Sequence, residues 1–111
     1  MPLSIAETEK IYKTMAVAAH TESCYLARAR GAFPVFNYEM EKSHAYLGKV
    51  LEACGPEVVE LWKTTGRRNI SLTTTAPTGS VSILTGTTSG IEPAFLLSYK
   101  RRRKINPNDV A

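Results

Sequence analysis

The stretch NISLTTTAPTGSVSIL, Asn69 to Leu84, sets the expected fold of this chain. Ile70 and Leu72 alternate with polar residues, and this period of two predicts a strand over 69–75. Pro77 and Gly79 then predict a turn, and SVSIL is long enough only for a short helix. A strand, a glycine-containing turn and a helix start in close succession indicate an α/β protein.

The same part of the chain carries no charge. The neutral segment covers 69–91, and about half of its side chains are Ser or Thr. The first amides of a helix have no acceptor within it, and the helix dipole places partial positive charge there. Gly79 permits an anion to approach closely, while Thr78, Ser80 and Ser82 carry hydroxyls. The pattern alone leaves two interpretations open, a phosphate-binding turn or a plain helix cap at Thr78. The stretch APTGS is not a P-loop, because it lacks the lysine of that motif.

Helical periodicity dominates the chain before this stretch. A first helix is predicted over 5–30, where Gly31 supplies the stop signal. A second is predicted over 39–54, and a third begins at Pro56 and ends at Gly66. The apolar face expected on the first helix consists of Thr8, Ile11, Met15, Ala18, Ala19, Tyr25, Leu26 and Ala29.

These elements predict a partial α/β domain with about three to four helices and two strands. The second strand is PAFLLSYK, 93–100, which is apolar enough to be buried on both faces. We expect one partial domain over 1–111. It would comprise a helical segment over 1–66, then strand, turn, short helix and strand over 67–104, and a flexible tail over 105–111. Unpaired strand edges leave open whether such a piece folds alone.

The composition excludes several classes of protein. Hydrophobic residues make up 43% and charged residues 22% of the chain, which is typical of a globular protein rather than of disorder. The net charge of +4 comes from the run Lys100 to Lys104. This run supports an alternative function, a small basic module that binds nucleic acid without being an enzyme. No signal peptide and no apolar run of about 20 residues is present, so we expect a cytoplasmic protein without a membrane segment.

The cysteines and histidines form no metal or redox motif. Cys24 and Cys54 are far apart and belong to no CxxC pair, so we expect free thiols. His20 and His44 fall on predicted helices without spaced ligand partners, and we expect structural or surface roles. Glu92, in SGIEP, is open to two interpretations: a structural carboxylate, or a hydrogen-bond acceptor for a sugar hydroxyl or a backbone amide. We predict no metal site and no catalytic residue.

The segment RRNISLTTTAPTGSVSILTGTTSGIEPAFLLSYKRR, Arg67 to Arg102, closely resembles part of the catalytic subunit of ribonucleotide reductases. The pairing of TTTAPTGSVS with SGIEP looks most like the adenosylcobalamin-dependent class. Upstream, ARARGAFPVF resembles the helix and loop that precede this region in that family. The resemblance covers about residues 5–104. It implies that the chain is a fragment of an α/β barrel of about ten strands.

The resemblance also implies a function, ribonucleoside-diphosphate reduction by radical chemistry that adenosylcobalamin starts. It assigns substrate-phosphate binding to Ala76, Pro77, Thr78, Gly79 and Ser80, and support of the substrate pocket to Ser82, Gly90 and Glu92. The family's N-x-C-x-E arrangement is absent from the sequence. We therefore expect a piece of a larger or split enzyme that is inactive alone and does not itself bind adenosylcobalamin. The expected partners are a ribonucleotide and the remainder of the reductase barrel, and not nucleic acid.

Overall fold

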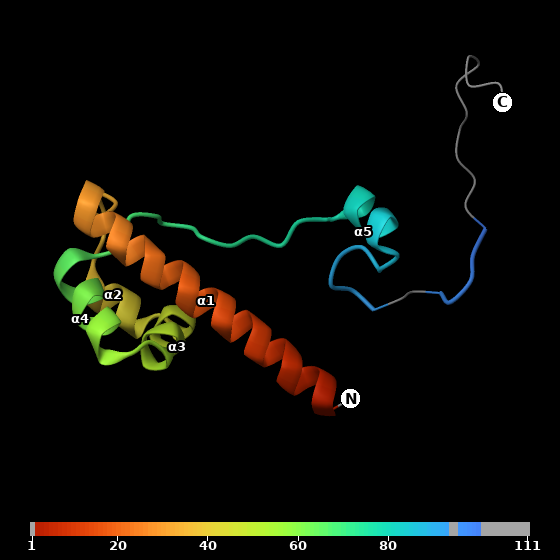
Figure 1. Cartoon of the computed structure of the whole chain (residues 1–111), viewed down its shortest axis with the longest axis horizontal. Helices are drawn as coiled ribbons and strands as arrows, with labels where there is room; N and C mark the ends of the chain where they lie inside the picture. Colours follow the sequence, from red (N-terminus) through yellow and green to blue (C-terminus); the bar gives the residue numbers. More distant parts are fainter. Residues whose placement is uncertain (1, 94–95, 101–111) are drawn as a thin grey trace, which may run out of the picture. The chain divides into compact units, whose positions relative to one another are not determined.

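The computed structural model of the chain describes residues 2–93 and 96–100. This described part contains five helices and is drawn in Figure 1. The helices are α1 (Pro2–Arg30), α2 (Tyr38–Ser43), α3 (Ala45–Ala53), α4 (Pro56–Thr65) and α5 (Gly79–Thr85). The chain divides into two compact units, residues 1–74 and residues 75–111. Helices α1 to α4 belong to the first unit and α5 belongs to the second.

Helix α1 confirms the first predicted helix, and its C-terminal end follows the expected signals. Arg28 and Arg30 lie in its last turn, where cations interact favourably with the helix dipole. Gly31 follows with a φ of 80°, and its amide donates to the carbonyl of Ala27 at 2.7 Å. This left-handed residue ends the helix, a conformation that glycine adopts without strain.

The predicted apolar face of α1 is wrong. Ile11, Met15 and Tyr25, which belong to that predicted face, are 51%, 52% and 38% exposed. Most of the buried side chains are small, so the helices α3 and α4, which pack against α1, can approach it closely. A prediction guided by hydrophobic size therefore selected the wrong face. The residues that α1 buries are Ala16, His20, Ser23, Cys24 and Ala27.

The single helix predicted over 39–54 is two helices, α2 and α3, separated at His44. The backbone of His44 is extended, with φ −74° and ψ 129°, so no helix passes through it. Its Nδ1 accepts the amides of Tyr46 and Leu47 at 3.3 and 3.4 Å. His44 thus caps α3, and the prediction missed the break because Ser, Thr, Asp and Asn are the usual cap residues.

Trp62 of α4 lies at the centre of the first unit. Its side chain is fully buried, and its ring stacks on His20 with ring centroids 5.2 Å apart. The Trp62 Nε1 donates to Oε2 of Glu41 at 2.7 Å. The same carboxylate pairs with Arg67, whose Nη2 lies 2.7 Å from Oε1, and both side chains are buried. This polar network joins α1, α2, α4 and the start of the segment that follows α4.

Acidification is expected to destabilise this unit through His20. Burial lowers the pKa of His20 from its usual 6.5, although the bond from its ring to the carbonyl of Ala16 acts in the opposite direction. Below pH 6.5 the unfolded chain therefore binds more protons at this residue than the folded unit does. The contribution to stability is full above that pH and is lost as the pH falls through the folded pKa. We expect a lower urea midpoint at about pH 5.5 than at about pH 7.5, measured by circular dichroism.

The control for this prediction is His20→Phe, which keeps an aromatic ring against Trp62 but cannot be protonated. The other charged groups that act on His20 are Glu41 and Arg67, and both remain in this variant. The difference between the two urea midpoints should shrink. An unchanged difference would assign the pH dependence to another group.

Neither predicted strand is present in the described residues, so the prediction of an α/β barrel fragment with two strands is wrong. Residues 69–75 run as irregular backbone. In the second predicted strand, 93–100, residues 94–95 lie outside the described residues and the others have no strand structure. A strand depends on hydrogen bonds to a neighbouring strand, and the described residues provide neither segment with one. The described structure is helical with irregular connections.

Gly66 ends α4 at a point of close approach. Its φ is 80°, and a Cβ there would lie 2.8 Å from Ala32 Cβ and from Phe36 Cδ1. Beyond it, the amide of Phe33 donates to the carbonyl of Arg67 at 3.0 Å. The loop after α1 is therefore held directly against the end of α4, which fixes the start of the neutral segment.

Candidate functional site

The chain turns at Thr78, the residue before α5. The carbonyl of Thr78 accepts the amide of Ser82 at 2.9 Å, which is the first helical bond. The amides of Gly79, Ser80 and Val81 precede this bond, and none of them has an acceptor among the described residues. The turn therefore presents three donors at the positive end of α5.

An open pocket of about 940 Å³ lies beside this turn, a size in the range of small-molecule sites. Four predicted site residues line it: Gly79, Ser80, Ser82 and Glu92. The other lining residues are Ile83, Thr87, Thr88, Ser89, Pro93, Leu96 and Tyr99. The predicted residues Ala76, Pro77, Thr78 and Gly90 are not part of the lining. The first turn of α5 and the SGIEP segment thus meet at one concavity.

Thr78 and Gly90, which do not line the pocket, connect these two segments. The amide of Gly90 donates to Oγ1 of Thr78 at 3.4 Å, and the Thr78 side chain makes no capping bond to α5. Thr78 is therefore the N-cap residue of α5, but it caps the helix through its backbone carbonyl and not through its side chain. Gly90 has a φ of 73°, and a Cβ there would collide with the carboxylate of Glu92. The left-handed conformation favours glycine at this position.

The two serines of α5 that line the pocket differ in what they offer a ligand. The hydroxyl of Ser82 donates to the carbonyl of Gly79 at 2.8 Å, and Ser82 is only 7% exposed. Ser80 is exposed, and its hydroxyl has no partner among the described residues. The donors on the residues that line the pocket are therefore the free amides of Gly79 and Ser80 and the hydroxyl of Ser80.

Glu92 is the one charged side chain in the described lining of the pocket. Because no lysine or arginine is among these residues, an anion bound here would be held by amides and hydroxyls. A carboxylate accepts hydrogen bonds and so suits hydroxyl groups of a ligand. The arrangement can bind a molecule with an anionic group at one end and hydroxyls beside it.

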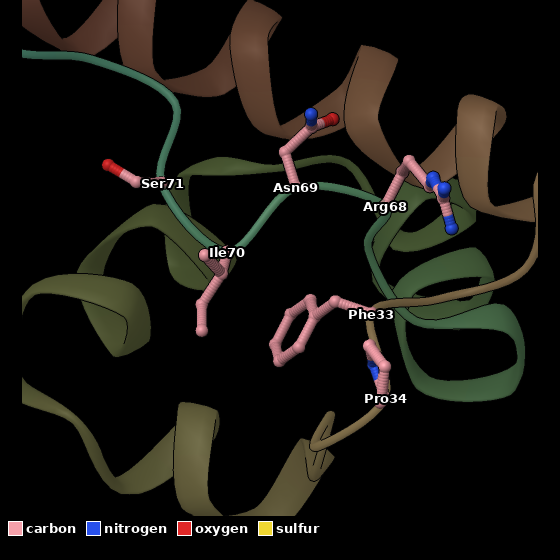
Figure 2. Close-up of a pocket in the computed structure, with 6 residues that line it drawn as sticks. All are labelled: Phe33, Pro34, Arg68, Asn69, Ile70 and Ser71. Carbon is pink, nitrogen blue, oxygen red and sulfur yellow. The ribbon is translucent and has the colours of Figure 1, made fainter.

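A second pocket, shown in Figure 2, belongs to the first unit. Phe33, Pro34 and Ile70 give it an apolar lining, while Arg68 and Asn69 turn toward α1. Arg68 donates to two carbonyls at the end of α1, at 3.3 and 3.4 Å. Asn69 is hydrogen-bonded to a serine of α1 at 3.0 and 3.1 Å. The polar groups of this pocket hold the chain to α1, so the pocket offers a ligand mainly an apolar wall.

The buried ion pair between Glu41 and Arg67 was not predicted from the sequence. This pair anchors the start of the neutral segment. Besides the ion pair, Arg67 Nη1 donates to the carbonyl of Asn69 at 2.6 Å. The pair stands 26 positions apart in the chain, so no local spacing reveals it. The sequence shows an arginine beside a segment free of charge, and it contains a single tryptophan. Neither feature indicates that Glu41 is the partner of Arg67 and of Trp62.

Neither cysteine has the environment of a reactive thiol. Burial raises the pKa of Cys24 to about 12 and also raises the pKa of Cys54. Both thiols are free, as predicted. Since the thiolate is the nucleophilic and metal-binding form, these side chains suit packing and not chemistry.

The histidines do not fit the role of metal ligands. His20 of α1 is buried and stacks on Trp62. Nδ1 of His44 accepts the amides at the start of α3 and so caps that helix. Within residues 2–93 and 96–100, no three His, Cys, Asp or Glu side chains are grouped so as to hold a metal ion. None of the helices in this part combines the length and apolar character that crossing a membrane requires.

Comparison with known proteins decides the family. The family model described as "Ribonucleotide reductase, barrel domain" matches residues 3–108. The chain belongs to the ribonucleotide reductase family. The resemblance to this family and to its cobalamin-dependent class, predicted from the sequence, is confirmed.

Two relatives of this reductase chain are vitamin B12-dependent ribonucleoside-diphosphate reductases. The one from Mycobacterium tuberculosis (strain CDC 1551 / Oshkosh) is 36% identical over 92 residues, which are 83% of this chain and 10% of the relative. The one from Thermoplasma acidophilum is 34% identical over 93 residues, which are 84% of this chain and 10% of the relative. The chain thus spans a small part of these relatives. No solved structure matches it.

Membership of the reductase family gives no support to the alternative function, a basic module that binds nucleic acid. The basic run on which a nucleic-acid-binding module would depend, Lys100 to Lys104, lies outside the described residues except for Lys100. The family match extends through this run. The run is therefore part of a reductase sequence, and no observation on the described residues favours the alternative.

Proposed function

We propose that this chain is part of an enzyme that reduces ribonucleoside diphosphates to deoxyribonucleotides, and that it supplies the site for the substrate's phosphates. The observation that carries the proposal is the pair of unbonded amides at Gly79 and Ser80, two residues that line a pocket with no lysine or arginine in its described lining. Such amides bind phosphoryl oxygens without a cation. The names of the relatives support the substrate class.

In this proposal each predicted segment has a distinct task. The turn from Ala76 to Ser80 holds the phosphates through its amides and the hydroxyl of Ser80. The bond between Thr78 and Gly90 keeps the SGIEP segment beside the turn. Glu92, on the same pocket, accepts hydrogen bonds from the hydroxyls of the ribose.

The proposal assigns the radical chemistry to the rest of the enzyme. We propose that this chain does not itself bind a cobalamin, since burial raises the pKa of both its thiols and His20 is buried against Trp62. When bound elsewhere in the complete reductase, adenosylcobalamin would supply the initiating radical. We propose that this chain has no catalytic residue, is inactive alone, and works in the cytoplasm, where free thiols stay reduced.

The test is a chimeric reductase in which this chain replaces the 92 matched residues of the Mycobacterium tuberculosis relative. We expect the purified chimera to reduce ribonucleoside diphosphates when adenosylcobalamin and a thiol reductant are present. The isolated chain should show no turnover. A chimera that has the circular dichroism spectrum and melting behaviour of the relative but reduces no nucleotide would contradict the proposed function.

A further inference from the structure

Helix α1 differs between its two halves. Every side chain that it buries lies at or after Ala16, where α3 and α4 pack against it. Before that point all described residues of the helix are exposed. Figure 1 shows this N-terminal half extending beyond the other helices of the first unit. About half of a long helix is therefore without a packing partner among the described residues of the first unit.

The exposed half carries the larger apolar side chains. Ile5, Ile11, Tyr12 and Met15 are 67%, 51%, 59% and 52% exposed. Tyr12 lies seven residues after Ile5, and Met15 lies three residues after Tyr12 and four after Ile11, so at about 100° per residue all four fall on one side of the helix. We call these four residues the α1 stripe. Single exposed apolar residues are ordinary, but a contiguous stripe indicates a surface that binds another surface.

The distribution of side-chain size along α1 strengthens this argument. The packed half buries two alanines, a serine, a cysteine and His20, whereas the uncovered stripe has two isoleucines, a tyrosine and a methionine. Burial of these four side chains against another apolar surface would be favourable. Lys10, on the other side of the helix, is 75% exposed at its side chain and pairs with Glu7 across 3.9 Å.

We infer that the α1 stripe docks onto an apolar surface of the reductase polypeptide that lies outside this chain. The family match begins at residue 3, so the stripe is part of the reductase domain and not an appended segment. The relatives have about ten times the length of the matched segment, which provides the partner surface. The inference rests on the proposed function, in which this chain is part of a larger enzyme.

The experiment compares the reactivity of single cysteines in the isolated 111-residue chain and in the chimera described above. Met15→Cys reports on the stripe, and Lys10→Cys is the control on the other side of α1. Both positions are exposed, so neither change disturbs packing. Maleimide labelling is measured at each cysteine by peptide mass spectrometry, which separates it from labelling of Cys24 and Cys54.

We expect labelling of Met15→Cys to be at least about tenfold slower in the chimera than in the isolated chain, since docking removes the thiol from solvent. Labelling of Lys10→Cys should change less than about twofold. Equal labelling of Met15→Cys in both proteins would overturn the inference. Equal slowing of both cysteines would also overturn it, because burial would then not be specific to the stripe.

A second copy of this chain is the competing occupant. If the isolated chain doubles its mass in light scattering and Met15→Cys becomes slow to label as concentration rises, the stripe is a dimer contact and the inference fails. The labelling of Met15→Cys tests the docking of the α1 stripe, and the activity of the chimera tests the proposed function. If the chimera is active and Met15→Cys is labelled as fast as in the isolated chain, only the inference about the stripe is contradicted. If the chimera is inactive and Met15→Cys is protected, only the proposed function is contradicted.

Discussion

Gly79→Asp in the chimeric reductase is expected to raise the KM for the ribonucleoside diphosphate by about a hundredfold or more. The carboxylate would lie at the first amide of α5, where the proposal places the phosphates, and would repel them. Because this removes binding of substrate and transition state alike, kcat should fall much less than kcat/KM. The measurement is the initial rate as a function of substrate concentration.

Two control variants separate charge from structure. No atom lies within 4 Å of a Cβ built on Gly79, and its φ is not positive, so Gly79→Ala should leave the KM within about threefold. Leu84→Asp puts the same charge on the same helix, at a residue that is 88% exposed and outside the pocket lining. It should behave like the unsubstituted chimera. A normal KM in Gly79→Asp would exclude phosphate binding at this turn.

Glu41→Ala is expected to destabilise the first unit by about 3–5 kcal/mol, the usual result of leaving one partner of a buried ion pair alone. Arg67 would keep its charge at 3% exposure, and the Trp62 Nε1 would lose its acceptor. Small domains have about 5–15 kcal/mol of stability in total, so much of that margin would be lost. Urea unfolding followed by circular dichroism measures the change.

Glu39→Ala provides the comparison for this prediction. Glu39 lies on the same short helix as Glu41 but is exposed, so its loss should cost less than about 1 kcal/mol. Replacing both Glu41 and Arg67 with apolar residues should cost less than the sum of the single replacements, because no charge is then left unpaired. Similar urea midpoints for Glu41→Ala and Glu39→Ala would show that the pair contributes little.

Local signals and a specific motif determined what could be predicted from the sequence. Gly31 and Pro56 mark a helix end and a helix start, and the helices there were predicted within a few residues. The order of TTTAPTGSVS and SGIEP led to the reductase family, which the comparisons confirmed. The role of the turn before α5 in binding phosphate was predicted from the same motif and stays a prediction.

Three of the errors have a common physical origin, since each concerns a partner that is distant in the sequence. Alternation in 69–75 indicates side chains suited to a sheet, but a strand also requires a neighbouring backbone. The face of α1 was chosen by hydrophobic size, whereas close packing with α3 and α4 selected small residues such as Ala27. The ion pair of Glu41 and Arg67 exists only because the fold brings α2 beside the end of α4.

The position of Trp62 has a consequence for the optical spectroscopy of this protein. It is the only tryptophan of the chain, its indole is shielded from water, and it lies against an imidazole and a carboxylate. Its intrinsic emission therefore reports on the integrity of residues 2–74. A tryptophan introduced beside the pocket would add a second, independent signal, so that ligand binding and unfolding could be followed separately in one sample.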